Sequence, residues 1–322
     1  MEGYFPAAAV IKGVMIRLLL AAVAATLSLS VAAQTKRAFV VGLGRQQDAS
    51  WAKINGDRDA ELMTSLLRER RYSDLTTLVN EQATKAAITD GLAQLARRCR
   101  RGDQVLVHFS GHGQQMTDLD GDERDGWDEC WIPYDAFQAY GPSDRGERHL
   151  RDDELNTLLT AIRQRIGSSG RLLVVVDACH SGDSTRGDAS ETVRGTADHF
   201  VLPGAGARKF RGERRERWIT LSACLDYQRN SEVMTCGGSY GRLTYALSTI
   251  LRGNLPQDNA QLLRRIGQFF NEHRASLPQT PVLSGETEKW PVAQMFENQR
   301  GGGKIAWQHD VSASSPRPST PT

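Results

Sequence analysis

Two short polar signatures each follow an apolar run, and each contains one side chain that could do covalent or proton-transfer chemistry. The first is Ser110-Gly111-His112-Gly113 after residues 105–109, and the second is Asp177-Ala178-Cys179-His180-Ser181-Gly182 after residues 172–176. A thiolate is a strong nucleophile, and a nearby imidazole favours the thiolate and can protonate a leaving amine. The glycines beside both residues let a substrate backbone approach closely. His112 and Cys179 together therefore predict acyl-transfer chemistry.

A parallel sheet is the element that would bring these two residues together. β-rich apolar runs at 38–43, 75–79, 105–109, 172–176 and 218–221 alternate with helical patterns at 57–70, 83–98, 153–166, 240–251 and 259–273. This alternation predicts an α/β fold with a mostly parallel central sheet flanked by helices. Sites in such sheets form beyond the carboxyl ends of the strands, so neighbouring strands would bring His112 and Cys179 close to each other.

Taken singly, each of the two residues has a simpler interpretation. A lone histidine in a loop or a lone buried thiol is more often structural than catalytic. The other cysteines, Cys99, Cys130, Cys224 and Cys236, form no C-x-x-C spacing, so we expect them to serve in packing or in one disulfide rather than in a zinc site. The two signatures in combination favour the Cys–His pair.

The two signatures resemble the catalytic histidine and cysteine motifs of the caspase-like peptidases, peptidase family C14, and they are closest to metacaspases of the bacterial kind. The resemblance extends over roughly residues 37–295, through the segments 56–60, 128–133, 152–155, 222–228 and 279–284. It implies a caspase-hemoglobinase fold. It also implies a thiol protease with Cys179 as nucleophile, His112 as general acid and base, and the N–H groups of Gly113 and Cys179 as the oxyanion hole. No cofactor is required for this chemistry.

The same resemblance implies a preference for substrates with basic residues. The positions that match the metacaspase S1 pocket are Asp59, Ser110 and Asp177, whose charge would favour Arg or Lys at the cleavage site. Each aspartate could instead be an ordinary surface or capping residue. The expected partners are protein or peptide substrates with basic residues.

The acidic segment 118–129 raises the question of calcium. It spaces Asp118, Asp120, Asp122 and Glu129 like an EF-hand, but Glu123 stands where that loop needs glycine, so a solvated acidic loop is the simpler interpretation.

Metacaspases suggest a different set of calcium ligands. In many of them calcium is held by aspartates that match Asp128, Asp152 and Asp153, plus one acid shortly after the catalytic cysteine. Arg186 occupies that last position, with Asp183 and Asp188 only nearby. Calcium at Asp128, Asp152 and Asp153 therefore remains an open alternative to a structural acidic cluster.

The chain divides into five expected parts. Residues 1–33 read as a signal peptide, because Arg17 precedes an apolar run and small residues end at Ala33. Residues 34–185 form the large catalytic part, 186–217 a linker or activation loop, 218–300 the small part, and 301–322 a disordered tail. The signal predicts export to the periplasm or the medium, without stable membrane insertion.

Composition narrows the classes of function. The formal net charge of +2 gives no reason to expect a nucleic-acid partner. The basic stretch 208–217 is either a solvated loop or a target for self-cleavage. The alternative to a peptidase is a non-catalytic binding module with the caspase fold, a pseudoenzyme.

Overall fold

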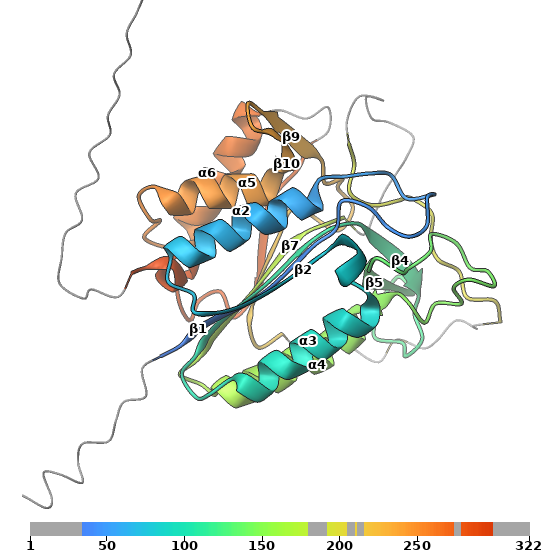
Figure 1. Cartoon of the computed structure of the whole chain (residues 1–322), viewed down its shortest axis with the longest axis horizontal. Helices are drawn as coiled ribbons and strands as arrows, with labels where there is room; N and C mark the ends of the chain where they lie inside the picture. Colours follow the sequence, from blue (N-terminus) through green and yellow to red (C-terminus); the bar gives the residue numbers. More distant parts are fainter. Residues whose placement is uncertain (1–33, 180–191, 205–209, 211–215, 274–277, 299–322) are drawn as a thin grey trace, which may run out of the picture.

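A six-stranded, mostly parallel sheet forms the centre of the protein (Figure 1). The computed structural model describes residues 34–179, 192–204, 210, 216–273 and 278–298. The strand order is β11-β8-β7-β3-β1-β2, and β11 is antiparallel to its neighbour β8. The strands are β1 (Lys36–Gly42), β2 (Asp74–Val79), β3 (Gln104–Ser110), β7 (Arg171–Asp177), β8 (Ile219–Ser222) and β11 (Val282–Gly285).

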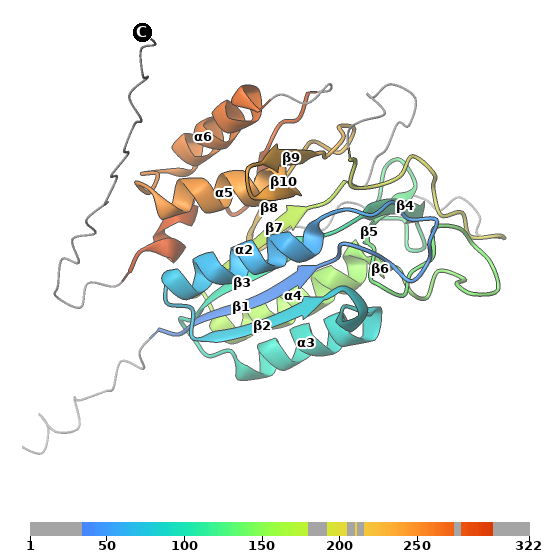
Figure 2. The same cartoon turned by 45° about the horizontal axis from the view of Figure 1, so that its top comes forward.

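Helices cover both faces of the sheet (Figures 1 and 2). One face carries α2 (Gly56–Glu69), α5 (Arg242–Arg252) and α6 (Asn259–Glu272), and the other carries α3 (Lys85–Arg98) and α4 (Asp152–Ile166). Short 3-10 turns, η1 (Asn80–Gln82) and η2 (Val292–Phe296), complete the shell. The predicted strands and helices are confirmed to within two residues at most boundaries, and so is the α/β fold class.

Alternating side chains of the central strands supply the two cores. In β3, Leu106 packs with the core on the α2 side, whereas Val105 and Val107 pack with the core on the α3 side. Successive side chains of a strand point to opposite faces of the sheet. A strand with apolar residues on both faces must therefore be covered by other elements on both faces. Every residue of β3 is buried. This is why the run at 105–109 lies in the middle of the sheet.

The register of β3 and β7 fixes the position of the two signatures. The strands are adjacent and parallel, and Ser110 is directly opposite Asp177. His112 follows β3 by two residues and Cys179 follows β7 by two residues. The predicted neighbour relation of the two strands is therefore confirmed, and both signatures leave the sheet at the same edge.

Two small sheets were not expected from the sequence. One contains β4 (Gly113–Thr117), β5 (Trp127–Trp131) and β6 (Leu150–Arg151), and the other is the hairpin of β9 (Glu232–Thr235) and β10 (Gly238–Gly241). The expectation of a loop throughout 118–129 was wrong at its end, because β5 begins at Trp127 and pairs with β4. Both small sheets border the carboxyl edge of the main sheet.

Several predicted segments fall outside the described residues. These are the expected signal peptide (1–33), the tail from 301, residues 180–191 after Cys179, and most of the basic stretch 208–217. Among the helices of the described ranges, none is long and apolar enough to cross a bilayer.

Candidate active site

Cys179 lies just beyond β7 and is buried. Its thiol donates a hydrogen bond to the carbonyl oxygen of Gln228, at 2.9 Å. The Cys224 thiol is hydrogen-bonded with Cys179, and this contact together with burial raises the pKa of Cys224 far above its ordinary value. Cys224 is therefore protonated, while Cys179 is the thiol at the edge where the signatures meet.

His112 lies in the turn between β3 and β4, and its ring is fixed from two sides. It stacks on Trp51 with ring centroids 4.9 Å apart, and its Nε2 is 2.8 Å from the carbonyl oxygen of Ala52. Since a carbonyl can only accept, Nε2 carries the proton and Nδ1 is the basic nitrogen. Nδ1 is buried and has no hydrogen-bond partner among the residues that the structure describes. It is the atom left available to exchange a proton.

Burial determines the charge of His112. The pKa falls to about 4, chiefly because burial disfavours the imidazolium; the Ala52 carbonyl opposes this shift and the positive charge of Arg194 adds to it. The ring is therefore neutral at physiological pH, as a general base must be before it takes a proton.

The two N–H groups expected to form the oxyanion hole, those of Cys179 and Gly113, differ in their surroundings. The backbone N–H of Cys179 donates a 2.8 Å hydrogen bond to the carbonyl oxygen of Arg194. Gly113 opens β4 beside Trp131 of β5. Of the two expected donors, Cys179 already holds a carbonyl oxygen of this chain.

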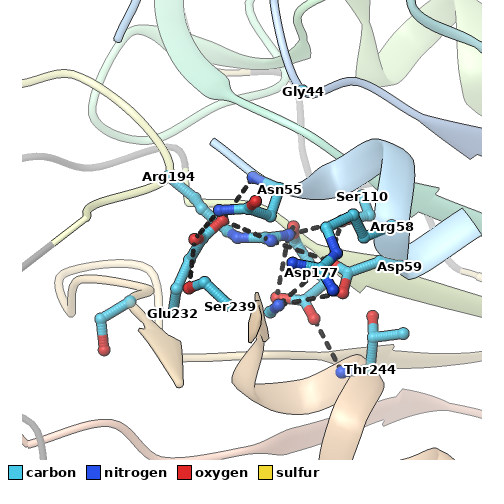
Figure 3. Close-up of polar contacts among 12 residues, drawn as sticks. Gly44, Asn55, Arg58, Asp59, Ser110, Asp177, Arg194, Glu232, Ser239 and Thr244 are labelled. Carbon is cyan, nitrogen blue, oxygen red and sulfur yellow. Dashed lines mark hydrogen bonds and ion pairs between the residues drawn. The ribbon is translucent and has the colours of Figure 1, made fainter. Parts of the chain in front are cut away.

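The three expected pocket residues converge on the side chain of Arg194 (Figure 3). A guanidinium nitrogen of Arg194 lies 2.7 Å from the Asp59 carboxylate, and another lies 3.8 Å from Asp177. The same guanidinium also donates to the hydroxyl of Ser110. Asp59, Asp177 and Arg194 have no exposed side-chain surface. Asp59, Ser110 and Asp177 therefore form one buried pocket, and an arginine fills it.

A third acid completes this pocket, and sequence reasoning missed it. Glu232 of β9 lies 2.8 Å from the Arg194 guanidinium. Its second carboxylate oxygen accepts from the Asn55 side chain at 2.6 Å and from Ser239 at 2.7 Å. The only sequence signal was that Glu232 lies shortly after segment 222–228, which takes part in the family resemblance. The sequence of the β9–β10 hairpin, which directs Glu232 into the pocket, has no recognisable strand pattern.

Backbone and side-chain donors hold the two aspartates in place. Asp177 accepts from the Thr244 backbone N–H and from the Asn230 side chain, each at 2.7 Å. Asp59 accepts from the Ser110 hydroxyl at 2.7 Å and from the Gly241 backbone N–H at 3.0 Å. A Cβ at Gly241 would lie 2.3 Å from the Asp177 carboxylate, so this position requires glycine. The carboxylates are thus oriented from α5, β10 and β3 at once.

The pocket carries more negative charge than the single arginine neutralises. Burial raises the pKa of Asp59 to about 7; Arg194 opposes the shift and the neighbouring Asp177 reinforces it. Burial disfavours the charge of Arg194, but Asp59, Asp177 and Glu232 outweigh this and raise its pKa further. The pocket is built to hold a permanent cation.

The segment that carries Arg194 pairs with the chain like a bound peptide. The Arg194 N–H donates to Asn230 at 2.9 Å, and the Glu232 N–H donates to the Thr192 carbonyl at 3.1 Å. Between them, Val193 forms an antiparallel bridge with Ser231. Extended peptides bind at sheet edges by this pattern of main-chain bonds.

The acidic residues suggested for calcium also converge. Asp128, Asp152 and Asp153 each offer an oxygen within 4.8 Å of the others, and Asp128 shares a second such group with Asp118, Asp120 and Asp122. Burial raises the pKa of Asp128 to about 7 and that of Asp152 to about 8, with neighbouring acids adding to both shifts. In the described ranges, one buried oxygen each of Asp128 and Asp152 has no hydrogen-bond partner.

One cation already lies beside this acidic group. Arg151 is 3.4 Å from Asp128 and balances part of its charge. The expected effect of Arg186, and the compensation from Asp183 or Asp188, lie outside the described residues. The carboxylate oxygens fit a hard cation such as calcium, which prefers oxygen ligands.

A cleft of about 990 Å³ opens next to the acidic group, on the α4 side of the sheet. Glu123, Glu129 and Asp152 line it together with Trp131 and Trp218. It is separate from the pocket around Arg194.

Comparisons with known proteins agree on the type of fold. The caspase domain model of the peptidase C14 family matches residues 35–290. Metacaspase-1A of Aspergillus clavatus is 29% identical over 241 residues, which cover 63% of this chain and 53% of that protein. Metacaspase-1 of Coccidioides immitis is 28% identical over 241 residues, covering 63% and 49%. The matched region thus spans about half the length of these curated relatives.

Two solved structures have a similar fold. Protein GSU0716 from Geobacter sulfurreducens is 23% identical with a TM-score of 0.54, covering 78% of this chain and 94% of that one. Caspase-1 from Spodoptera frugiperda is 14% identical with a TM-score of 0.51, covering 78% and 86%. At these identities the likeness concerns the fold.

Proposed function

The chain belongs to the caspase domain family of cysteine peptidases, and from this premise we propose that it is an endopeptidase that cleaves after arginine with His112 and Cys179 as its dyad. One observation carries the specificity. Arg194 lies in the pocket of Asp59, Ser110 and Asp177 while its carbonyl accepts a hydrogen bond from the N–H of Cys179. A bound substrate arginine would make the same two sets of contacts.

In the proposed mechanism, His112 starts as a neutral imidazole and Cys179 as a thiol. His112 Nδ1 takes the proton of the Cys179 thiol, because Nε2 is committed to the Ala52 carbonyl. Sγ attacks the substrate carbonyl carbon, and the Cys179 N–H stabilises the oxygen that becomes negative; losing such a donor costs on the order of 10²-fold in rate. His112 then protonates the leaving amine, and water hydrolyses the thioester.

The geometry supports arginine over lysine at the pocket. Three carboxylates surround the guanidinium: one terminal nitrogen of Arg194 lies against both Asp59 and Glu232, and the other faces Asp177. A guanidinium presents five donors in a planar fork, whereas an ammonium is a point charge with a shorter reach. We expect arginine peptides to be cut faster than lysine peptides, and aspartate peptides to be rejected by the acidic pocket.

A pseudoenzyme with the caspase fold is the competing function. Such a module needs neither a basic Nδ1 nor a thiol at the same sheet edge, and both are present. An active-site probe with an arginine and a thiol-reactive group distinguishes the two. Labelling of Cys179 and hydrolysis of arginine peptides support the peptidase, whereas a well-folded protein with neither property is the binding module.

We further propose that Asp128, Asp152 and Asp153 hold a calcium ion. The observation behind this is the group of three carboxylates, one buried and two half-buried, whose oxygens lie within 4.8 Å of one another. Within the described part of the chain, one buried oxygen each of Asp128 and Asp152 has no hydrogen-bond partner. Calcium would neutralise these acids and hold β5 and the start of α4 together; it would take no part in the bond cleavage. The ligand set is all oxygen, as calcium sites require.

Export remains a proposal that depends on residues 1–33. The test is to compare the N-terminal sequence of the protein from the host's medium or periplasm with that of the cytosolic fraction. Processing after Ala33 in the exported fraction would support it.

A further inference from the structure

The peptide bond between Arg194 and Gly195 occupies the position of a substrate bond. The side chain of Arg194 fills the acidic pocket, its N–H pairs with Asn230, and its carbonyl oxygen accepts from the N–H of Cys179. These three contacts fix the side chain, the strand register and the carbonyl of one residue. A buried arginine that served only to balance charge would need the first contact alone.

Gly195 continues this arrangement on the far side of the bond. A Cβ built there would lie 2.3 Å from the carbonyl oxygen of Cys179 and 3.3 Å from the Cβ of Cys179. The φ of Gly195 is +156°, a value that side chains rarely allow. The residue after the arginine thus lies against the nucleophile's own backbone, and only glycine fits.

The chain after Gly195 is anchored elsewhere. The Phe200 N–H donates to the Gln115 carbonyl at 2.8 Å, and the Thr117 N–H donates to the Phe200 carbonyl at 3.1 Å. Phe200 itself is fully buried. The bond is therefore held from both sides, by Asn230 and Glu232 before it and by β4 after it.

We propose that Arg194–Gly195 is the internal bond that this peptidase cuts in its own chain, and that the uncut segment 192–194 occupies the substrate site. The inference rests on the proposed function, since it needs an active Cys179. It places the cut at Arg194 rather than in the basic stretch 208–217, where the abundance of arginine and lysine predicted it.

The cleavage balances without any further reagent. The Cys179 thiol first leaves the Gln228 carbonyl by a side-chain rotation and gives its proton to His112. Sγ bonds to the Arg194 carbonyl carbon, the carbon–nitrogen bond to Gly195 breaks, and His112 returns the proton to the Gly195 nitrogen. His112 then takes a proton from the water that adds to the thioester carbon, the carbon–sulfur bond breaks, and His112 returns this proton to the Cys179 thiolate. Arg194 is left as a carboxylic acid, which loses its proton to solvent, and Gly195 as an amine.

Glu232 makes the pocket specific for this residue. It accepts hydrogen bonds from Arg194 through its side chain and donates through its backbone N–H to Thr192. Glu232 therefore contacts both the arginine side chain and the main chain of the segment that carries it. Other substrates would pair with the same strand, and we expect the preferred sequence to contain arginine followed by glycine.

The test follows the self-cleavage of the full-length protein, with and without calcium chloride, by intact mass and N-terminal sequencing. We expect a new N-terminus that begins Gly195-Thr196-Ala197-Asp198 in the wild type and in Arg264→Gln, a matched loss of charge on the exposed face of α6. Cys179→Ala and Arg194→Gln should lack this fragment.

Gly195→Ala leaves the Arg194 side chain itself unchanged, but the added methyl group would lie 2.3 Å from the Cys179 carbonyl oxygen, so the bond after Arg194 must shift away from the nucleophile. We expect it to slow the cut by at least about tenfold, which protects the test if Arg194→Gln fails to fold. A second assay measures hydrolysis of an arginine-ending peptide in the same samples. Peptide hydrolysis together with an intact Arg194–Gly195 bond, or with cuts only at 208–217, overturns this inference and leaves the proposed function standing. A protein that neither hydrolyses the peptide nor binds the active-site probe overturns both.

Discussion

The backbone N–H of Cys179 donates a 2.8 Å hydrogen bond to the carbonyl oxygen of Arg194, 15 residues further along the chain. This contact joins the nucleophile of the proposed dyad to the residue that fills the acidic pocket. The same residue is thus held by its carbonyl at the backbone of Cys179 and by its guanidinium at Asp59. The uncut protein resembles a complex of enzyme and substrate in one chain.

Replacing either member of the dyad should remove peptidase activity. We expect Cys179→Ala and His112→Ala to lower kcat/KM on arginine peptides on the order of 10⁴-fold or more, since each removes a group that the bond cleavage needs. Cys99→Ala is the control, because burial raises the pKa of Cys99 to about 11 and keeps that thiol protonated. Comparable losses in Cys99→Ala and Cys179→Ala would show that the thiols are misassigned.

Removing one carboxylate of the pocket should weaken recognition of arginine and spare the thiol. For Asp177→Asn we expect kcat/KM on arginine peptides to fall by about 30-fold or more, which corresponds to the loss of about 2–5 kcal/mol when one partner of a buried charge pair is removed. Alkylation of Cys179 by iodoacetamide should continue. Glu61→Gln, an exposed acid on α2, is the control. Undiminished arginine cleavage by Asp177→Asn would assign the pocket elsewhere.

The bound segment should delay the onset of activity. Wild-type protein purified before processing should hydrolyse an arginine peptide with a lag that ends as the cut fragment accumulates. Arg194→Gln leaves the pocket open, so its progress curve should be linear from the first minute, although this variant cannot be cut at that bond. A lag of equal length in Arg194→Gln would show that Arg194 does not block the pocket.

Burial of His108 should make stability depend on pH. Its Nε2 is 3.0 Å from the Thr244 hydroxyl, and its pKa falls to about 4, chiefly through burial, with Asp177 opposing the shift and Arg194 adding to it. A histidine with a depressed folded-state pKa stabilises fully above pH 6.5, and this contribution is lost as the pH falls towards 4.

The measurement is the free energy of unfolding in urea at several pH values. Wild type should lose about 3 kcal/mol more than His108→Gln between pH 6.5 and pH 4, because a shift of one pKa unit corresponds to about 1.4 kcal/mol. Comparing the two proteins cancels the opposite contribution of Asp59. Parallel pH profiles would contradict the prediction.

Calcium should stabilise the fold through the acidic group. With an affinity of about 10⁻³ M, 10 mM calcium should add roughly 1.4 kcal/mol to the free energy of unfolding. Asp152→Asn should lower this gain, and magnesium should give less because it loses its water ligands reluctantly. Thermal melts in calcium, magnesium and chelator measure the effect. Identical melting temperatures in all three would leave the aspartates as a structural cap with Arg151.

The main sheet was predictable because its central strands, β3 and β7, have apolar residues on both faces and the helices that cover it have a clear period. The smaller sheets were not, since β6 has two residues and β9 has four, of which only Val233 and Met234 are apolar. Pocket residues Asp59, Ser110 and Asp177 came from the resemblance to metacaspases, which covers the first turn of α2 and the ends of β3 and β7. Arg194 and Glu232 are 38 residues apart in the sequence, and no local sequence pattern predicts their contact. Only the folded chain brings an arginine of the linker into the acidic pocket.

The pairing of β7 with β8 bears on what happens to the molecule after its backbone is opened. These strands lie on opposite sides of the cut in sequence, yet they are hydrogen-bonded neighbours from Leu173 and Ile219 to Val176 and Ser222. A break at residue 194 would therefore convert one polypeptide into two that share one sheet and the hydrophobic core on its α2 side. The two pieces should separate on a denaturing gel but elute together, at the volume of the intact chain, in gel filtration.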